Sequence, residues 1–175
     1  DRIHPIPIGL ENPEWHPELN KIAKIDKIHR YIINNPKHYD LRTGTLISCN
    51  PNTHISRKAL IQFPNFKNTI NGYNFDEYIV DLLNHHFCLC PRGNGLDTHR
   101  FWEAIYCGCI PVCIDIGYSY FDVYKTIPGI YVSEFKEFTI VNPEYIINKK
   151  FSKFVYFDGW KELITNRVRY ENMLS

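Results

Sequence analysis

Residues 87–114 read FCLCPRGNGLDTHRFWEAIYCGCIPVCI, two continuous apolar runs with a helical pattern between them. The first run, 87–90, has no polar alternation, which is typical of a strand buried on both faces of a parallel sheet. A turn with two glycines follows, then a helix is predicted over 98–106, with Gly108 as its stop signal. The second run, 109–114, is another buried strand. This segment therefore predicts strand, turn, helix and strand, the repeating unit of a parallel α/β sheet.

The flanking sequence continues the alternation of strands and helices. Residues 17–33 carry apolar side chains at intervals of three and four, which predicts an amphipathic helix. The pattern as a whole indicates an α/β fold with a doubly wound parallel sheet, in which ligands bind beyond the carboxyl ends of the strands. The other predicted elements are a strand over 45–49, a turn at 50–53 that caps a following helix, a helix over 75–84, a strand over 130–132 and a terminal helix over 159–174.

Length and composition limit the function classes. The chain has 175 residues, enough for one domain, and we expect a proline-rich extended segment over 1–16 followed by that domain over 17–175. The formal net charge of +1 gives no global argument for nucleic acid or an anionic membrane as a partner. No apolar stretch is long enough to span a bilayer, so we expect a soluble chain, for which cytoplasmic and Golgi-lumenal locations both fit. The absent initiator methionine suggests a piece of a longer polypeptide.

The cysteines form the one cluster that could suggest a metal. There are six, and five of them lie between Cys88 and Cys113. Their spacing contains no C-x2-C pair of the kind that structural zinc sites use. We therefore predict buried, reduced thiols and no structural metal.

The glycine turn (residues 91–95) and the start of the next helix carry the chemistry. Gly93 and Gly95 let the backbone approach a ligand closely, and the free N–H groups at a helix start favour an anion through the helix dipole. Arg92 and Arg100 bracket this turn and can donate paired hydrogen bonds to a diphosphate. The region therefore predicts a phosphate site.

Two carboxylates lie close to the same turn in sequence. Asp97 is placed either to cap the helix or to contact a ligand hydroxyl. Glu103 follows Arg100 by three residues and His99 by four, so these side chains can share a helical face, and a carboxylate there would suit a diol such as ribose. Other nucleotide motifs fit less well, because the third glycine of the dinucleotide fingerprint and the Gly-Lys-Ser/Thr of NTPase loops are both absent.

Residues 87–114 resemble the nucleotide-sugar-binding half of exostosin-like glycosyltransferases. The resemblance rests on a glycine turn and an arginine before a helix with Glu-Ala, then Gly-Cys-x-Pro-Val. Blocks at 5–12 and 49–57 also resemble small relatives of that family, so the match extends patchily over positions 5–114. It implies a GT-B fold, in which two Rossmann-like domains face a cleft and the C-terminal one holds the nucleotide diphosphate sugar.

The resemblance also implies roles for particular residues. Glu103 would bind the ribose hydroxyls, and Arg92 and Arg100 the diphosphate. His99 and Asp97 would line the sugar end. Positive side chains and a helix N-terminus would replace a metal, so no cofactor is expected, and no catalytic residue is assigned. The donor-binding residues implied are Asn50, Thr53, Arg57, Arg92, Gly93, Asn94, Gly95, Asp97, His99, Arg100 and Glu103.

The activity implied is transfer of a sugar from a nucleotide diphosphate sugar, UDP-linked, to a hydroxyl of a glycan or protein. The chain is shorter than a two-domain transferase, so we expect the N-terminal acceptor domain to be missing. Two alternatives stay open. One is a catalytically incomplete module that binds the nucleotide sugar without turnover, and the other is a relative of GDP-fucose-type fucosyltransferases.

Overall fold

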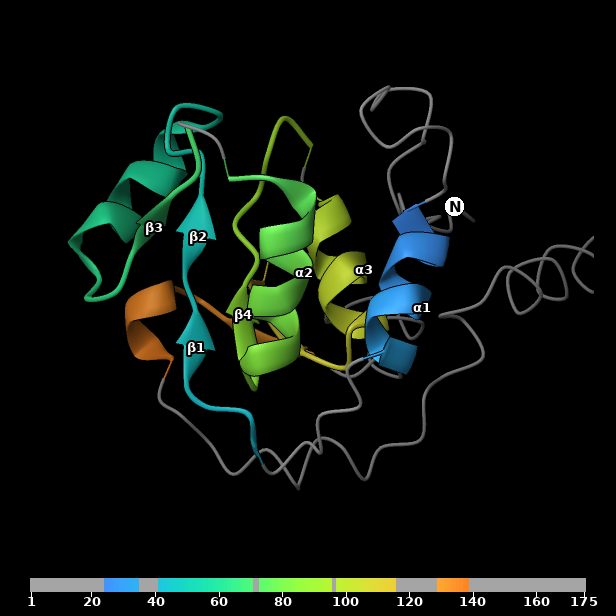
Figure 1. Cartoon of the computed structure of the whole chain (residues 1–175). Helices are drawn as coiled ribbons and strands as arrows, with labels where there is room; N and C mark the ends of the chain where they lie inside the picture. The colour runs from blue at the N-terminus through green and yellow to red at the C-terminus, as the bar shows by residue number, and fades with distance from the viewer. Residues whose placement is uncertain (1–23, 35–40, 71–72, 96, 116–128, 139–175) are drawn as a thin grey trace, which may run out of the picture.

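The computed structural model describes residues 24–34, 41–70, 73–95, 97–115 and 129–138, and every structural statement below concerns these (Figure 1). Strands and helices alternate along this part of the chain, as the hydrophobic pattern predicts. The elements are α1 (Lys24–Asn34), β1 (Thr45–Leu46), β2 (Ser48–Cys49), η4 (Ile55–Gln62), β3 (Lys67–Asn68), α2 (Phe75–Asn84), β4 (Phe87–Leu89), α3 (His99–Tyr106), β5 (Ile110–Ile114), β6 (Ile130–Val132) and η6 (Phe135–Glu137).

The described strands are all parallel and form one sheet of order β1-β4-β5-β6 and a pair β2-β3. The strands β1 and β2 are two halves of one extended segment, residues 45–49. Its first half pairs with β4, with Thr45 opposite Phe87, and its second half pairs with β3, with Ser48 opposite Lys67. The spatial order is therefore β3, segment 45–49, β4, β5 and β6. In chain order this is 2-1-3-4-5, a doubly wound arrangement whose winding reverses between segment 45–49 and β4.

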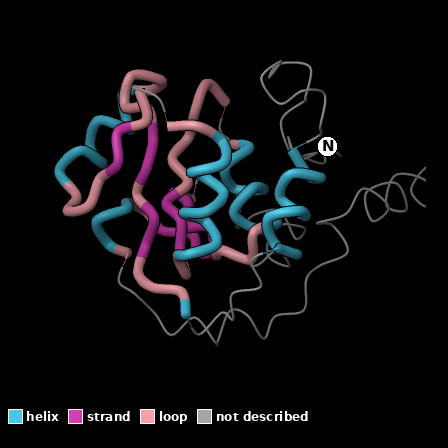
Figure 2. The backbone as a smooth tube through the Cα atoms, in the orientation of Figure 1, coloured by secondary structure: helices cyan, strands magenta, loops and turns pink. Residues whose placement is uncertain are grey.

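Side chains from the central strands enter two cores, one on each face of the sheet. Cys88 and Cys90 lie in a core with residues of α1, α2 and α3, whereas Phe87 and Leu89 lie in a second core with residues of η4 and η6. In Figure 2 the strands run between helices on either side. Burial on both faces explains why 87–90 and 109–114 are apolar without alternation. The predicted doubly wound, Rossmann-like α/β fold is confirmed.

Two local predictions need correction. The helix that carries Arg57 is a 3-10 helix, and its N-cap is His54 rather than a residue of the 50–53 turn, because the His54 ring accepts a hydrogen bond from the Ser56 amide at 3.2 Å. The predicted strand 45–49 is interrupted at Ile47, where the pairing partner changes from β4 to β3.

All six cysteines are free and buried, which confirms the prediction of reduced core thiols. Burial raises the pKa of Cys90 and Cys109 well above the ordinary thiol value, so both stay protonated. The extended segment 1–16 and the terminal helix 159–174 lie outside the described residues. Among the helices that the structure describes, none has the length and apolar character needed to cross a bilayer.

Candidate functional site

The residues predicted to bind a ligand come from two loops at the same edge of the sheet. One loop follows β2 and leads into η4, and the other follows β4 and leads into α3; both lie at the upper edge in Figure 1. The helix η4 packs on one face of the sheet and α3 on the other. The loops thus diverge at the carboxyl ends of neighbouring parallel strands. This is the topological switch point, where open α/β sheets bind ligands.

The N-terminus of α3 lies at this edge of the sheet. Thr98 occupies the N-cap position but makes no side-chain cap hydrogen bond, and the first turn of the helix contains no acidic residue. The positive end of the helix dipole is therefore left without a counter-charge within that turn. An anion is the ligand that such an arrangement favours.

Arg92, in the glycine turn, has donor capacity left over. Its side chain is partly buried, one terminal nitrogen lies 3.4 Å from the Asn94 carbonyl oxygen, and Nε is shielded from solvent without a hydrogen-bond partner. Asn94 and Gly95 are exposed at the tip of the turn. The other terminal nitrogen has no partner among the described residues, and a guanidinium with free donors on the loop that leads into a helix N-terminus is suited to bind a phosphate group.

Arg57 lies beneath the same turn and is 9% exposed. Its Nε donates to the Arg92 carbonyl at 2.7 Å, and its terminal nitrogens lie 3.4 Å from the carbonyls of Asn50 and Pro91. Burial lowers the pKa of Arg57, and the charge of Arg100 lowers it further, but a guanidinium stays protonated at neutral pH. Arg57 therefore joins both loops through their backbones.

Arg100 extends from the first turn of α3 toward segment 45–49. It donates to the backbone carbonyl of Ser48 and lies 2.9 Å from the Ser48 hydroxyl, and its guanidinium stacks 5.0 Å from the Tyr78 ring centre. Burial lowers its pKa, but Tyr78 and buried thiols raise it by more, so the net shift is upward. Within the described part of the chain, neither Arg57 nor Arg100 has a carboxylate at ion-pair distance. Within the described residues these two arginines are therefore not balanced by a direct ion pair, although the charge of the buried Glu103 acts on Arg100.

The two carboxylates of the predicted site, Asp97 and Glu103, have different surroundings. Both Asp97 oxygens lie 3.2 Å from the Trp102 indole nitrogen, and Thr98 rather than Asp97 holds the N-cap position. Glu103 is 5% exposed, on the side of α3 that faces the core. Its charge acts on Arg100 and Tyr78, although no ion pair joins it to Arg100.

The remaining predicted residues lie on the two loops. Asn50 shapes its own loop, because its side-chain oxygen accepts a hydrogen bond from the Asn52 amide at 2.9 Å. Thr53 is exposed, and its methyl group lies 4.0 Å from the point where a Gly93 Cβ would stand. His99 begins α3 and is partly exposed. The structure therefore brings Asn50, Thr53 and Arg57 together with the glycine turn, while Arg100 and Glu103 point away from it into the fold.

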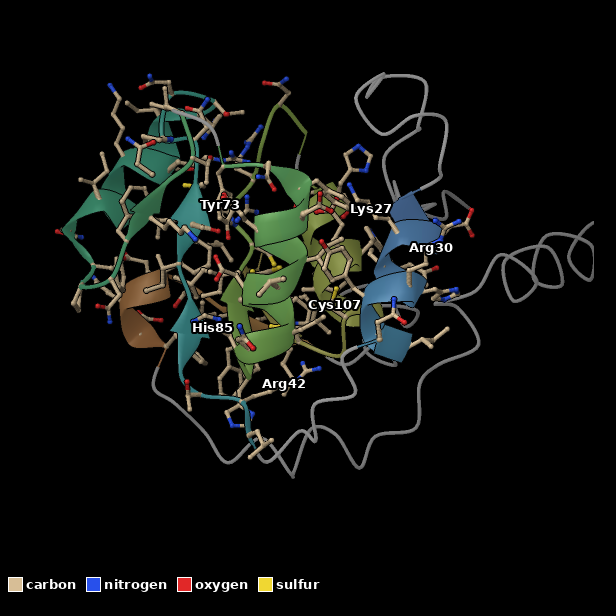
Figure 3. The ribbon with its side chains drawn as sticks, viewed as in Figure 1. Lys27, Arg30, Arg42, Tyr73, His85 and Cys107 are labelled. Atoms are coloured by element: carbon tan, nitrogen blue, oxygen red, sulfur yellow. The ribbon has the colours of Figure 1, made fainter. Side chains whose placement is uncertain are left out.

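Sequence reasoning missed the partners of Arg100. Ser48 is a hydroxyl residue in a short apolar run, and such a residue often marks a point where a buried backbone or cation needs an oxygen. Tyr78 fits the apolar face of α2 by spacing, and nothing in that spacing distinguishes it from a core phenylalanine. Tyr73, labelled in Figure 3, donates to Asp81, which also accepts from Lys67 at 2.6 Å, so these hydrogen bonds join β3 to α2.

Comparison with known proteins identifies the family of this chain. The family model described as the exostosin GT47 domain matches residues 29–129. Exostosin-1 of Drosophila melanogaster is 48% identical over 42 residues, which are 24% of this chain and 6% of the relative. The exostosin-1 homolog of Caenorhabditis elegans is 48% identical over 42 residues, or 24% of this chain and 11% of the relative. A probable glycosyltransferase of Arabidopsis thaliana is 49% identical over 37 residues, or 21% of this chain and 7% of the relative.

These matches cover only a small part of each relative, between 6% and 11% of its length. The family model is broader, because it extends from α1 through the switch point and β5 to residue 129. The parallel α/β architecture described above is the one that the resemblance to a GT-B donor domain implies. By the extent of the family match, the chain belongs to the exostosin GT47 family.

Proposed function

We propose that this chain is the donor-binding portion of a glycosyltransferase, and that it binds a nucleotide diphosphate sugar, UDP-linked, for transfer to a hydroxyl of a glycan or protein. The observation that supports the proposal is that the loop after β4, which carries Arg92, leads at the topological switch point into the N-terminus of α3, where Thr98 makes no side-chain cap hydrogen bond. Membership of the exostosin GT47 family and the relatives' names support transferase chemistry.

In this proposal the diphosphate lies between Arg92 and the first turn of α3. Hydrogen bonds from a guanidinium and from helix-start N–H groups neutralise the charge that develops on the leaving diphosphate as the bond to the sugar breaks. This arrangement needs no metal. Asn50 and Thr53 are proposed as contacts on the opposite loop. Because the Glu103 side chain is buried on the core side of α3, its binding of the ribose hydroxyls stays a prediction from the family resemblance, which the Glu103→Gln variant tests.

Calorimetric titration of UDP, GDP and uridine tests the binding part. We expect UDP to bind more tightly than GDP, and uridine to bind weakly because it lacks the diphosphate. The Arg92→Met variant should weaken UDP binding by about 30-fold, the loss typical of charge-assisted hydrogen bonds. Glu103→Gln should weaken UDP and uridine by the same factor. The matched control is Lys58→Met, which removes an exposed cation from η4.

The outcomes separate the candidate functions. Absence of binding by either nucleotide contradicts the proposal. Preference for GDP would favour the fucosyltransferase-type alternative. Turnover is tested by measuring UDP release from UDP-sugars with glycan acceptors, since a module that only binds the donor would hold UDP-sugar without releasing UDP.

A further inference from the structure

We infer that Arg57 is a positioning residue: it holds the backbone of the glycine turn so that the side chain of Arg92 is directed at the diphosphate, and it does not contact the donor itself. The inference rests on the proposed function for its ligand, and it reverses the sequence prediction that Arg57 binds the donor directly. The evidence lies in the hydrogen bonds of Arg57, in the strand geometry beneath the turn and in the contrast with Arg92.

The donors of Arg57 are occupied by carbonyl groups from both loops. The shortest bond, 2.7 Å, runs from Nε to the carbonyl of Arg92, the residue that it would position. The two longer contacts, each 3.4 Å, reach Asn50 on one loop and Pro91 on the other. Because a guanidinium is planar and its N–H groups diverge at fixed angles, these contacts fix the separation of the loops.

The strand geometry explains why the loops need such a bridge. Segment 45–49 pairs with β4 only through Thr45 and Leu46, and its second half pairs with β3 instead. Beyond Leu46 the segment and β4 therefore have no ladder hydrogen bonds between them, although Pro91 is buried there. Carbonyl groups in such a gap need donors from elsewhere, and Arg57 supplies them.

Gly93 fits closely against this bridge. A Cβ at position 93 would stand 3.2 Å from a terminal nitrogen of Arg57, which is tighter than ordinary contact. The glycine thus allows the guanidinium to lie directly under the turn. Arg92 differs from Arg57, because among the described residues one terminal nitrogen of its guanidinium makes a single contact, 3.4 Å to the Asn94 carbonyl, and the other terminal nitrogen keeps its donors for a ligand. Arg57 therefore supports the backbone of the turn, and Arg92 binds the ligand.

A double-mutant cycle tests whether Arg57 acts through Arg92. UDP affinity is measured for Arg57→Met, Arg92→Met and the double variant of the 175-residue chain, with Lys58→Met as the control for charge removal from η4. We expect losses of about tenfold, about 30-fold and again about 30-fold, because Arg57 has nothing left to position once Arg92 is gone. Independent losses that multiply to about 300-fold would mean a separate contact of Arg57 with the donor, and would overturn the inference.

The Arg57→Lys variant separates charge from geometry. A lysine ammonium keeps the positive charge but cannot reproduce the planar fork, so we expect it to weaken UDP binding almost as much as Arg57→Met. Affinity equal to that of the unmodified chain would overturn the inference, since charge alone would then suffice. Arg57→Lys also serves if Arg57→Met unfolds below the titration temperature.

Backbone amide hydrogen exchange, measured without any nucleotide, tests the positioning role of Arg57 independently of the proposed function. We expect the amides of Gly93 and Asn94 to exchange at least about tenfold faster in Arg57→Met than in Lys58→Met, because the turn loses its support. Unchanged exchange overturns the positioning role even if UDP binds. If these amides exchange faster in Arg57→Met but the unmodified chain binds no nucleotide, the result supports the positioning of the turn by Arg57 and contradicts only the proposed function.

Discussion

The helices α2 and α3 pack on the same face of the sheet, but their N-termini are opposite in character. The start of α2 is satisfied by its own sequence: the Asn74 side chain accepts a hydrogen bond from the Glu77 amide at 2.9 Å, and Asp76 and Glu77 lie in its first turn. The start of α3 has no side-chain cap from Thr98 and no acidic residue in its first turn, which instead contains Arg100.

The two helix starts therefore differ in the acidic residues of their first turns, and Asp97, the carboxylate that precedes the N-cap of α3, lies against the indole nitrogen of Trp102. A helix N-terminus carries a partial positive charge, which acidic side chains stabilise and cations oppose. At the other end of α3 a cation is favourable, and there Arg42 donates to the Gly108 and Cys107 carbonyls at 2.7 and 2.8 Å (Figure 3). The N-terminal end of α3 combines a positive dipole with Arg100 in its first turn, so an anionic ligand would stabilise that end.

The largest expected effect concerns the C-terminal end of α3, where Arg42 supplies hydrogen bonds to the backbone carbonyls. Arg42→Met removes two charge-assisted hydrogen bonds and leaves buried carbonyls without a donor, so the free energy of unfolding should fall by about 3 kcal/mol. Urea denaturation measures it, with the exposed Arg30→Met as the control, which should change by less than about 0.5 kcal/mol. Loss of UDP affinity in a folded Arg42→Met protein would contradict a purely structural role at this end.

A smaller effect on the free energy of unfolding is expected at the N-caps, where the residues that start α2 and α3 can be compared directly. Asn74→Ala should cost about 1 kcal/mol of unfolding free energy, because α2 loses its side-chain cap. Thr98→Ala should cost less than about 0.5 kcal/mol, because no cap hydrogen bond is lost. Chemical denaturation of both variants checks this pair. Equal costs would mean that the α3 N-terminus is as well satisfied as that of α2.

The smallest expected effect is a pH dependence of the free energy of unfolding that arises from Asp81 in α2. Burial raises the pKa of Asp81, but hydrogen bonds from Lys67 and Tyr73 lower it by more, to below the ordinary value of 3.8. A carboxyl whose pKa is lowered by folding stabilises the protein above that ordinary value and loses this contribution as the pH falls through the folded pKa. Denaturation at pH 5 and pH 3 should therefore show a smaller acid-induced loss in Asp81→Asn, by about 0.5 kcal/mol after solvent screening. An identical loss in both proteins would show that Asp81 is not stabilised by these partners.

The fold could be predicted from the sequence because burial on both faces of a sheet leaves a direct signal. Residues 87–90 are apolar at every position, and the structure divides them between two cores. The interruption at Ile47 leaves no such signal, because pairing with β3 and pairing with β4 both suit a short apolar strand. Most element types follow from local pattern, although η4 is a 3-10 helix and the short strand β3 is not predicted, whereas the choice of partner strand depends on the assembled sheet.

The sequence predicts where in the fold the candidate site lies, but not which contacts each of its side chains makes. Glycines and arginines after a buried strand locate the switch point, yet sequence spacing treats Arg57, Arg92 and Arg100 as equivalent. Their roles differ because Arg57 and Arg100 lie where segment 45–49 separates from β4 and backbone carbonyls need donors. Similarly, Asp97 and Thr98 are both residue types that favour an N-cap, and the packing of Trp102 against Asp97 leaves Thr98 in that position.

The most direct test puts a carboxylate where the diphosphate is proposed to bind. Thr98→Asp should raise the thermal midpoint, because it supplies the missing negative cap of α3, and should weaken UDP binding at least about tenfold, because that carboxylate occupies and repels the anion site. The matched substitution Asn74→Asp at the start of α2 should leave UDP affinity unchanged. Unaltered UDP binding in a stabilised Thr98→Asp protein would contradict the assignment of the α3 N-terminus as the diphosphate site.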